Sequence, residues 1–157
     1  MEDYKTLFEF DIRDSFAFKD KLKLYFEFYD FRLTNDESDN FDFVKKGSFL
    51  DGWKFNPLNW ESKITIKISE TDKVNISYTA MSNGSISPIA MTPLYENFLS
   101  NLERFINYKE DFKEKNEVQI AKARKKVLKY YALVVLGIVL GSFLGAMLSH
   151  ITEIKLF

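Results

Sequence analysis

Five cationic side chains are clustered shortly before the carboxyl-terminal end of this 157-residue chain. Spacings of three, one and three residues place the four lysines among them on one face of a helix. Three interpretations follow: contact with anionic lipid headgroups, which accounts for every charge, binding of a nucleotide or single-stranded oligonucleotide, or docking of an acidic partner. The cluster, called the basic collar below, consists of Lys122, Arg124, Lys125, Lys126 and Lys129.

Residue types suited to catalysis are sparse. The only histidine is His150, and the chain has no cysteine, which excludes disulfides and cysteine-type zinc sites. Glycine-rich phosphate loops and serine-nucleophile motifs are absent from the sequence. We therefore expect a protein that is not an enzyme and that holds no metal or cofactor. An active site made of carboxylates alone stays open.

The segment Gly47–Trp60 combines both tryptophans of the chain with two phenylalanines and a proline. Aromatic side chains dominate the energetics of many interfaces, which makes this segment a candidate partner or assembly surface. The alternative, which we favour, is a linker that packs its rings over the sheet. The residues concerned are Phe49, Trp53, Phe55 and Trp60.

Residues Tyr130–Ser149 contain neither charge nor proline. Twenty residues of helix span about 30 Å, the thickness of the hydrocarbon core of a bilayer, which predicts one transmembrane helix. Small residues recur within it at every fourth position, and this spacing places them on one stripe. Such a stripe lets two helices approach closely in lipid, so we expect self-association through it. Its members are Gly137, Gly141, Gly145 and Ser149.

The flanks of the apolar run predict its orientation. The basic collar precedes the run, and only the tail His150–Phe157 follows it. An excess of lysine and arginine marks the cytoplasmic side of a span. We expect a tail-anchored, single-pass protein of the cell (inner) membrane with residues 1–129 in the cytoplasm.

Charge divides the chain into four parts. Residues 1–108 carry 13 basic and 18 acidic side chains, a net of −5, which indicates an acidic cytoplasmic domain. Residues 109–129 carry 8 and 4, a net of +4, and are predicted to form a charged helical stalk that ends in the basic collar. The transmembrane helix is expected over residues 130–149, with an extracytoplasmic tail over 150–157.

Hydrophobic periodicity predicts the elements of the first part. Alternation indicates strands over Tyr4–Ile12, Lys63–Ser69 and Lys73–Ala80, the last two forming an antiparallel hairpin. A helix is expected from about Phe16 to Phe28, with Asp14 and Ser15 as candidate caps. A further hairpin turns at the polar run 35–40, which resembles a calcium loop only loosely. Residues 85–90 fit either a short strand or a loop.

The second predicted helix begins at Thr92, a candidate cap, with Pro93 in its first turn. Neither proline nor glycine occurs from Glu96 to Leu136, which predicts a long, nearly continuous helix running through the stalk into the membrane. The order strand, helix, strands, helix favours an α+β domain with one antiparallel sheet and helices on one face. This order resembles that of the TATA-binding-protein-like and helix-grip folds.

The basic collar and the small-residue stripe, taken with a small cytoplasmic domain, resemble the membrane effectors of bacterial anti-phage systems, of which the Hailong-type effectors are one example. This resemblance covers roughly residues 109–149. It implies a homo-oligomer in which a nucleotide or oligonucleotide signal controls a membrane channel. The partners expected on this basis are lipid, further copies of the chain and the nucleotide ligand.

Two other functions compete with a ligand-gated channel. A tail-anchored scaffold would recruit a cytoplasmic protein to the membrane through the aromatic segment 49–60. A lipid-handling domain would hold an apolar ligand between the sheet and its helices.

Overall fold

The computed structural model describes residues 2–13, 17–47, 55–81 and 86–154. Contacts divide the chain into two units, Met1–Arg124 and Lys125–Phe157. The described elements, in chain order, are β1 (Tyr4–Asp11), α1 (Phe18–Phe28), β2 (Arg32–Asp36), β3 (Asn40–Lys45), the 3-10 helix η1 (Pro57–Asn59), β4 (Ser62–Ile68), β5 (Lys73–Ala80), the 3-10 helix η2 (Pro88–Met91), α2 (Thr92–Tyr108) and α3 (Lys113–Ile154).

The five strands form one antiparallel sheet with the order β1-β5-β4-β3-β2. Strands β2, β3 and β4 each pair with the next strand along the chain, whereas β1 pairs with β5 and sets Tyr4 opposite Ala80. The predicted β4–β5 hairpin is confirmed, with Ile64 and Ile76 turned into the interior. The predicted α+β class with an antiparallel sheet is therefore correct.

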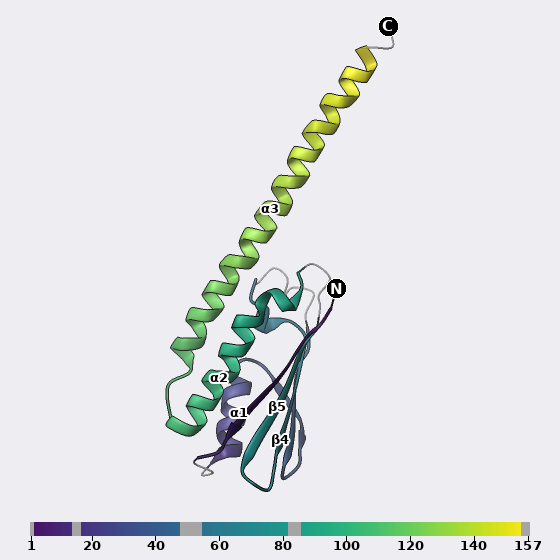
Figure 1. The fold of residues 1–157 in the computed structure, drawn as a ribbon. Helices are drawn as coiled ribbons and strands as arrows, with labels where there is room; N and C mark the ends of the chain where they lie inside the picture. The colour runs from purple at the N-terminus through teal and green to yellow at the C-terminus, as the bar shows by residue number, and fades with distance from the viewer. Residues whose placement is uncertain (1, 14–16, 48–54, 82–85, 155–157) are drawn as a thin grey trace. The chain divides into compact units, whose positions relative to one another are not determined.

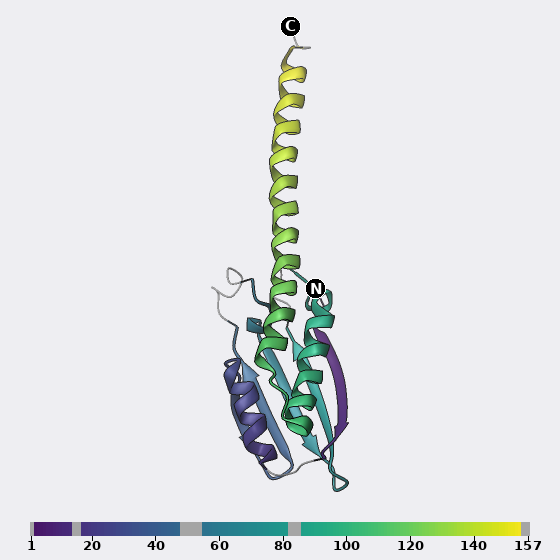
Figure 2. The ribbon, with the colours of Figure 1, turned by 90° about the vertical axis from the view of Figure 1, so that its left-hand side faces the viewer.

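Helices α1 and α2 cover one face of the sheet (Figure 1). Their apolar residues recur three and four positions apart, and this spacing gives each helix a single buried face. Aromatic rings join the two layers: the ring centroids of Phe26 on α1 and Phe43 on β3 are 4.7 Å apart. The first turns of α3 lie beside α1 and α2 (Figure 2), and Phe112, just before α3, packs 4.6 Å from the ring of Tyr25.

A turn over residues 109–112 separates α2 from α3, so the expectation of one nearly continuous helix from Glu96 is wrong. Lys109 adopts a left-handed backbone conformation (φ 55°, ψ 27°), which ends α2. The backbone N–H of Lys113 then donates to the carboxylate of Asp111 at 2.9 Å, which caps α3. Phe112 is only 3% exposed between these two residues. Its burial and the cap fix a turn that contains neither glycine nor proline.

The starts of the other helices differ from expectation in detail. The residue before α1 is Ala17 in a left-handed conformation, and the predicted caps Asp14 and Ser15 lie outside the described residues. Thr92 does not cap α2, because its hydroxyl donates to the carbonyl of Ile89 at 2.7 Å instead of accepting a helix N–H. Pro93 lies in the first turn of α2 as predicted. The ambiguous stretch before α2 contains the 3-10 helix η2.

The unit Lys125–Phe157 is described by the later turns of α3, as far as Ile154. Among the described residues, one helical stretch is long and apolar enough to cross a membrane, Lys113–Met147, with a mean hydropathy of 2.0 over its most apolar 18 residues. Only 6% of those residues are buried. Length and composition are those of a single membrane span, as the apolar run predicts.

Candidate functional site

The small-residue stripe lies open along α3. A β-carbon added at Gly137, Gly141 or Gly145 would meet nothing within 4 Å beyond its chain neighbours and the adjacent backbone of its own helix. The hydroxyl of Ser142, a polar group within the predicted span, donates to the carbonyl of Ile138 at 2.8 Å and so needs no partner outside the helix. Helix α3 also includes Ser149, whose side chain lies outside the described residues.

All five residues of the basic collar are exposed on α3, while Ala123 between them is buried. A helix thus holds the cations on its solvent side over a short length, as the spacing predicts. Cations on such an exposed helix surface attract anions and anionic headgroups.

The aromatic segment is described only in part, because Phe49 and Trp53 lie outside the described residues. Trp60 is 4% exposed and follows η1, where the amide oxygen of Asn56 caps the turn by accepting the Leu58 N–H at 3.1 Å. Phe55 is half-buried with a left-handed backbone (φ 50°). Trp60 therefore contributes to the interior of the folded unit, whereas Phe55 is only partly buried.

The space between sheet and helices is occupied by aromatic rings. The Tyr95 ring of α2 lies 4.9 Å from that of Tyr4 and 5.1 Å from that of Tyr78. All three residues are at most 6% exposed. These rings fill the place where a lipid-handling domain would hold an apolar ligand.

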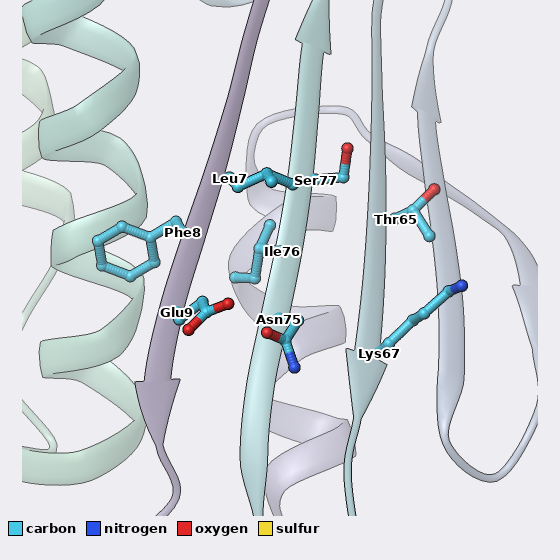
Figure 3. Close-up of a pocket in the computed structure, with 8 residues that line it drawn as sticks. All are labelled: Leu7, Phe8, Glu9, Thr65, Lys67, Asn75, Ile76 and Ser77. Atoms are coloured by element: carbon cyan, nitrogen blue, oxygen red, sulfur yellow. The ribbon is translucent and has the colours of Figure 1, made fainter.

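The opposite face of the sheet is open to solvent and carries a shallow hollow of about 240 Å³ (Figure 3). Small polar side chains of the two central strands form its floor: Asn75, Ser77 and Thr65. Leu7, which is 79% exposed, and Lys67 stand at its sides. Antiparallel sheets with one solvated face place alternate residues in this way.

Strand register collects cations on this open face. One cross-strand row runs Lys5, Thr79, Lys63, Val44 and Arg32. Lys67 lies two residues beyond Thr65 on the same side of β4. We call Lys5, Arg32 and Lys67 the open-face cations.

Two acidic side chains of the open face form ion pairs with cations other than these three. Glu9 pairs with Lys73 at 2.6 Å, and this hydrogen bond raises the pKa of Lys73. Asp42 accepts a hydrogen bond from the Thr65 hydroxyl at 2.5 Å and lies 3.7 Å from Lys63. Within the described residues the open-face cations have no ion-pair partner, and they stand out in a domain of net charge −5. The sequence shows the outward position of each, but only the register shows that all three lie on the same face of the sheet.

The described residues contain no group of three or more histidine, cysteine, aspartate or glutamate side chains arranged to hold a metal ion. The polar run 35–40 forms the end of β2, the start of β3 and the turn between them, as a hairpin requires. No protein-family model, curated protein or solved structure matches the chain.

Proposed function

We propose that this chain is a homo-oligomeric, single-span protein of the inner membrane whose cytoplasmic domain binds a nucleotide or oligonucleotide and thereby gates a channel. The observation that carries the proposal is the apolar, exposed part of α3 with its open glycine stripe. The place in anti-phage defence follows from the resemblance of the collar and the stripe to Hailong-type effectors.

The exposed apolar side chains of this helix favour contact with lipid or with another helix. Leu133, Ile138 and Phe143 are each more than 60% exposed. Removing apolar surface from water is favourable by about 25 cal/mol per Å², so each of these side chains favours lipid or a neighbouring helix by roughly 1–2 kcal/mol. Lipid covers the bulky positions, and the glycine stripe accepts a second helix at short distance.

Two cationic surfaces are available to an anionic ligand. The basic collar lies on α3, and the open-face cations lie on the solvent-exposed face of the sheet, where Lys67 borders the hollow. Phosphate binding by either surface is electrostatic and falls as salt rises. At the sheet, the hydroxyl of Ser77 and the amide of Asn75 add hydrogen-bond donors for such a ligand.

The first experiment measures assembly and flux. Purified full-length protein in detergent is expected to have a mass that is a multiple of 18.5 kDa, and in liposomes to conduct ions in a manner that ATP or a mixed-sequence single-stranded oligonucleotide changes. Gly141→Leu should reduce the particle to a monomer and abolish flux, whereas Val139→Leu, off the stripe, should leave both intact. A monomeric wild-type particle would refute the proposal and favour the tail-anchored scaffold.

The second experiment separates the two cationic surfaces. Oligonucleotide binding is measured by anisotropy over a salt series for three variants of the full chain. The first variant replaces the collar lysines with glutamine. The second replaces Lys5, Arg32 and Lys67 with glutamine. The control replaces Lys19 and Lys23, which both pair with Asp36 on another surface. The variant that removes the binding surface should lose affinity and flatten the salt dependence. Unchanged binding in all three would refute ligand capture by either surface.

A further inference from the structure

A buried polar residue interrupts an apolar seam at the start of α3. The residues that turn inward here are Phe112, Asn116, Ile120 and Ala123, spaced four, four and three apart, as a helix face requires. Three of them are apolar, but Asn116 is 1% exposed. A side-chain amide in such a place is costly unless each polar atom is hydrogen-bonded.

Asn116 is satisfied by a chain of hydrogen bonds that joins three helices. Asn101 of α2 donates its Nδ2 to the Asn116 Oδ1 at 2.8 Å. Asn116 donates its own Nδ2 to the Tyr25 hydroxyl of α1, also at 2.8 Å. The Tyr25 hydroxyl in turn donates to the carbonyl of Phe98 at 2.5 Å, which closes the chain on α2. Tyr25 is fully buried and Asn101 is 8% exposed.

This network fits one position of α3 on the other helices. Sliding α3 by one turn would place an apolar side chain against the Tyr25 hydroxyl and the Asn101 amide and would leave the Asn116 amide buried without partners. A buried polar group that loses its partner destabilises the arrangement that buries it. A single polar residue in an apolar helix seam fixes register in this manner.

The same contact contains an unsatisfied group. The hydroxyl of Tyr29 is buried near the Asn116 amide, which acts to lower its pKa, but among the described residues it makes no hydrogen bond of good geometry. Its ring lies 5.8 Å from that of Tyr25 and 6.1 Å from that of Phe112, so the hydroxyl is enclosed by the helices that meet α3. Water would satisfy this group if the first turns of α3 moved away. The docked arrangement therefore combines a specific network with a defect that opposes docking.

We propose that Tyr25, Asn101 and Asn116 form a polar latch that holds the first turns of α3 on α1 and α2 and that is the point at which those turns are released. The latch allows two states, docked in one register or detached, because intermediate positions bury unpaired amides. The latch itself is a property of the folded unit. Its consequence for the span, which belongs to the same helix, rests on the proposed function.

Hydrogen exchange on the full chain in detergent micelles tests the latch. Asn116→Ala should speed exchange of the amides of residues 117–124 at least roughly tenfold, while β4 and β5 keep their protection. Tyr29→Phe removes the unsatisfied hydroxyl and should slow exchange of the same amides. Asn97→Ala is the matched control, because the Asn97 amide donates to the Pro93 carbonyl within its own helix, and it should change nothing.

Opposite effects of Asn116→Ala and Tyr29→Phe, confined to residues 117–124, support the latch. Equal acceleration of the sheet and of residues 117–124 in Asn116→Ala would overturn it, since the amide would then stabilise the whole fold. Unchanged exchange at 117–124 in Asn116→Ala, or faster exchange there in Tyr29→Phe, would also overturn it. Particle mass and flux of the same variants report on the proposed function separately, so either inference can fail alone.

Discussion

The folded unit should lose stability steeply above pH 10, because its buried tyrosines are held as neutral phenols. Burial removes water from each hydroxyl and raises the pKa of all five. The pKa of Tyr29 reaches about 12, while that of an ordinary tyrosine is 10.0. The five residues are Tyr4, Tyr25, Tyr29, Tyr78 and Tyr95.

The sign of this effect follows from proton linkage. Between pH 10 and the raised pKa, the unfolded chain has released the phenol proton and the folded chain has kept it, so the free energy of unfolding falls as pH rises. Below pH 10 both states keep the proton and the stability is fully present. Each such tyrosine lowers the free energy of unfolding by up to about 1.4 kcal/mol per pH unit. For Tyr29, the loss between pH 8 and pH 11 is about 1.4 kcal/mol.

Tyr29→Phe isolates this contribution. Urea unfolding of the full chain in detergent is followed by tryptophan fluorescence, to which the buried Trp60 contributes. We expect the variant to gain about 1.4 kcal/mol relative to wild type between pH 8 and pH 11. Ile66→Val, which changes packing without changing a titratable group, is the control and should differ from wild type equally at both pH values.

Two results would refute this reasoning. A Tyr29→Phe variant with the same offset from wild type at pH 8 and pH 11 would show that the hydroxyl is not shielded in the folded state. Stability of the wild type that stays constant from pH 9 to pH 12 would show the same for the whole set of buried tyrosines.

Three further changes test the packing by urea unfolding at neutral pH. Asp111→Ala removes the cap of α3 and should cost about 1 kcal/mol, whereas an unchanged midpoint would mean that the cap is replaced. Ile66→Ala opens a cavity between sheet and helices and should cost about 2–5 kcal/mol, and a loss below 1 kcal/mol would contradict its place in the core. Leu7→Lys changes a residue that is 79% exposed and should alter stability by less than about 0.5 kcal/mol, so a larger loss would show that β1 is covered.

Local periodicity was sufficient to predict much of the sheet. In β4 and β5 every second residue is apolar, and those residues occupy the buried face. Alternation predicts these strands because successive side chains point to opposite faces of the sheet and one of the two faces is exposed to solvent. In β2, a bulge between Leu33 and Asn35 shifts the pairing. Simple alternation does not reveal such a shift, because it depends on the neighbouring strand.

The turn between α2 and α3 depends on tertiary contacts that local helix propensity does not include. Lys109 and Glu110 carry no local signal for ending a helix, and the sequence predicts continuity. The turn forms because Phe112 gains a buried position among the rings of α1 and α2, which is a tertiary effect. From the sequence alone, Asn116 is expected to be an exposed polar residue of the stalk. Its burial becomes visible only when α3 folds back.

The candidate surfaces differ in the same way, because some lie within one stretch of sequence and others form only through tertiary structure. The basic collar and the glycine stripe lie on a single helix, so their spacing was enough to place them together. The open-face cations Lys5, Arg32 and Lys67 come from three strands, and no single stretch of sequence contains them. They reach one face of the sheet only because β3 and β5 connect those strands.

The pairing of β1 with β5 also constrains the order in which the fold can assemble. Strands β2 to β5 follow one another in the chain and in the sheet, and short connections or a single longer one link them. Each can therefore pair with the preceding strand soon after it is synthesised. Strand β1 must wait for β5, its only neighbour in the sheet, and the large loop between them has to close first. The slow step of folding is therefore expected to be the arrival of the amino-terminal strand, and a nascent chain that ends before Ala80 keeps that strand unpaired.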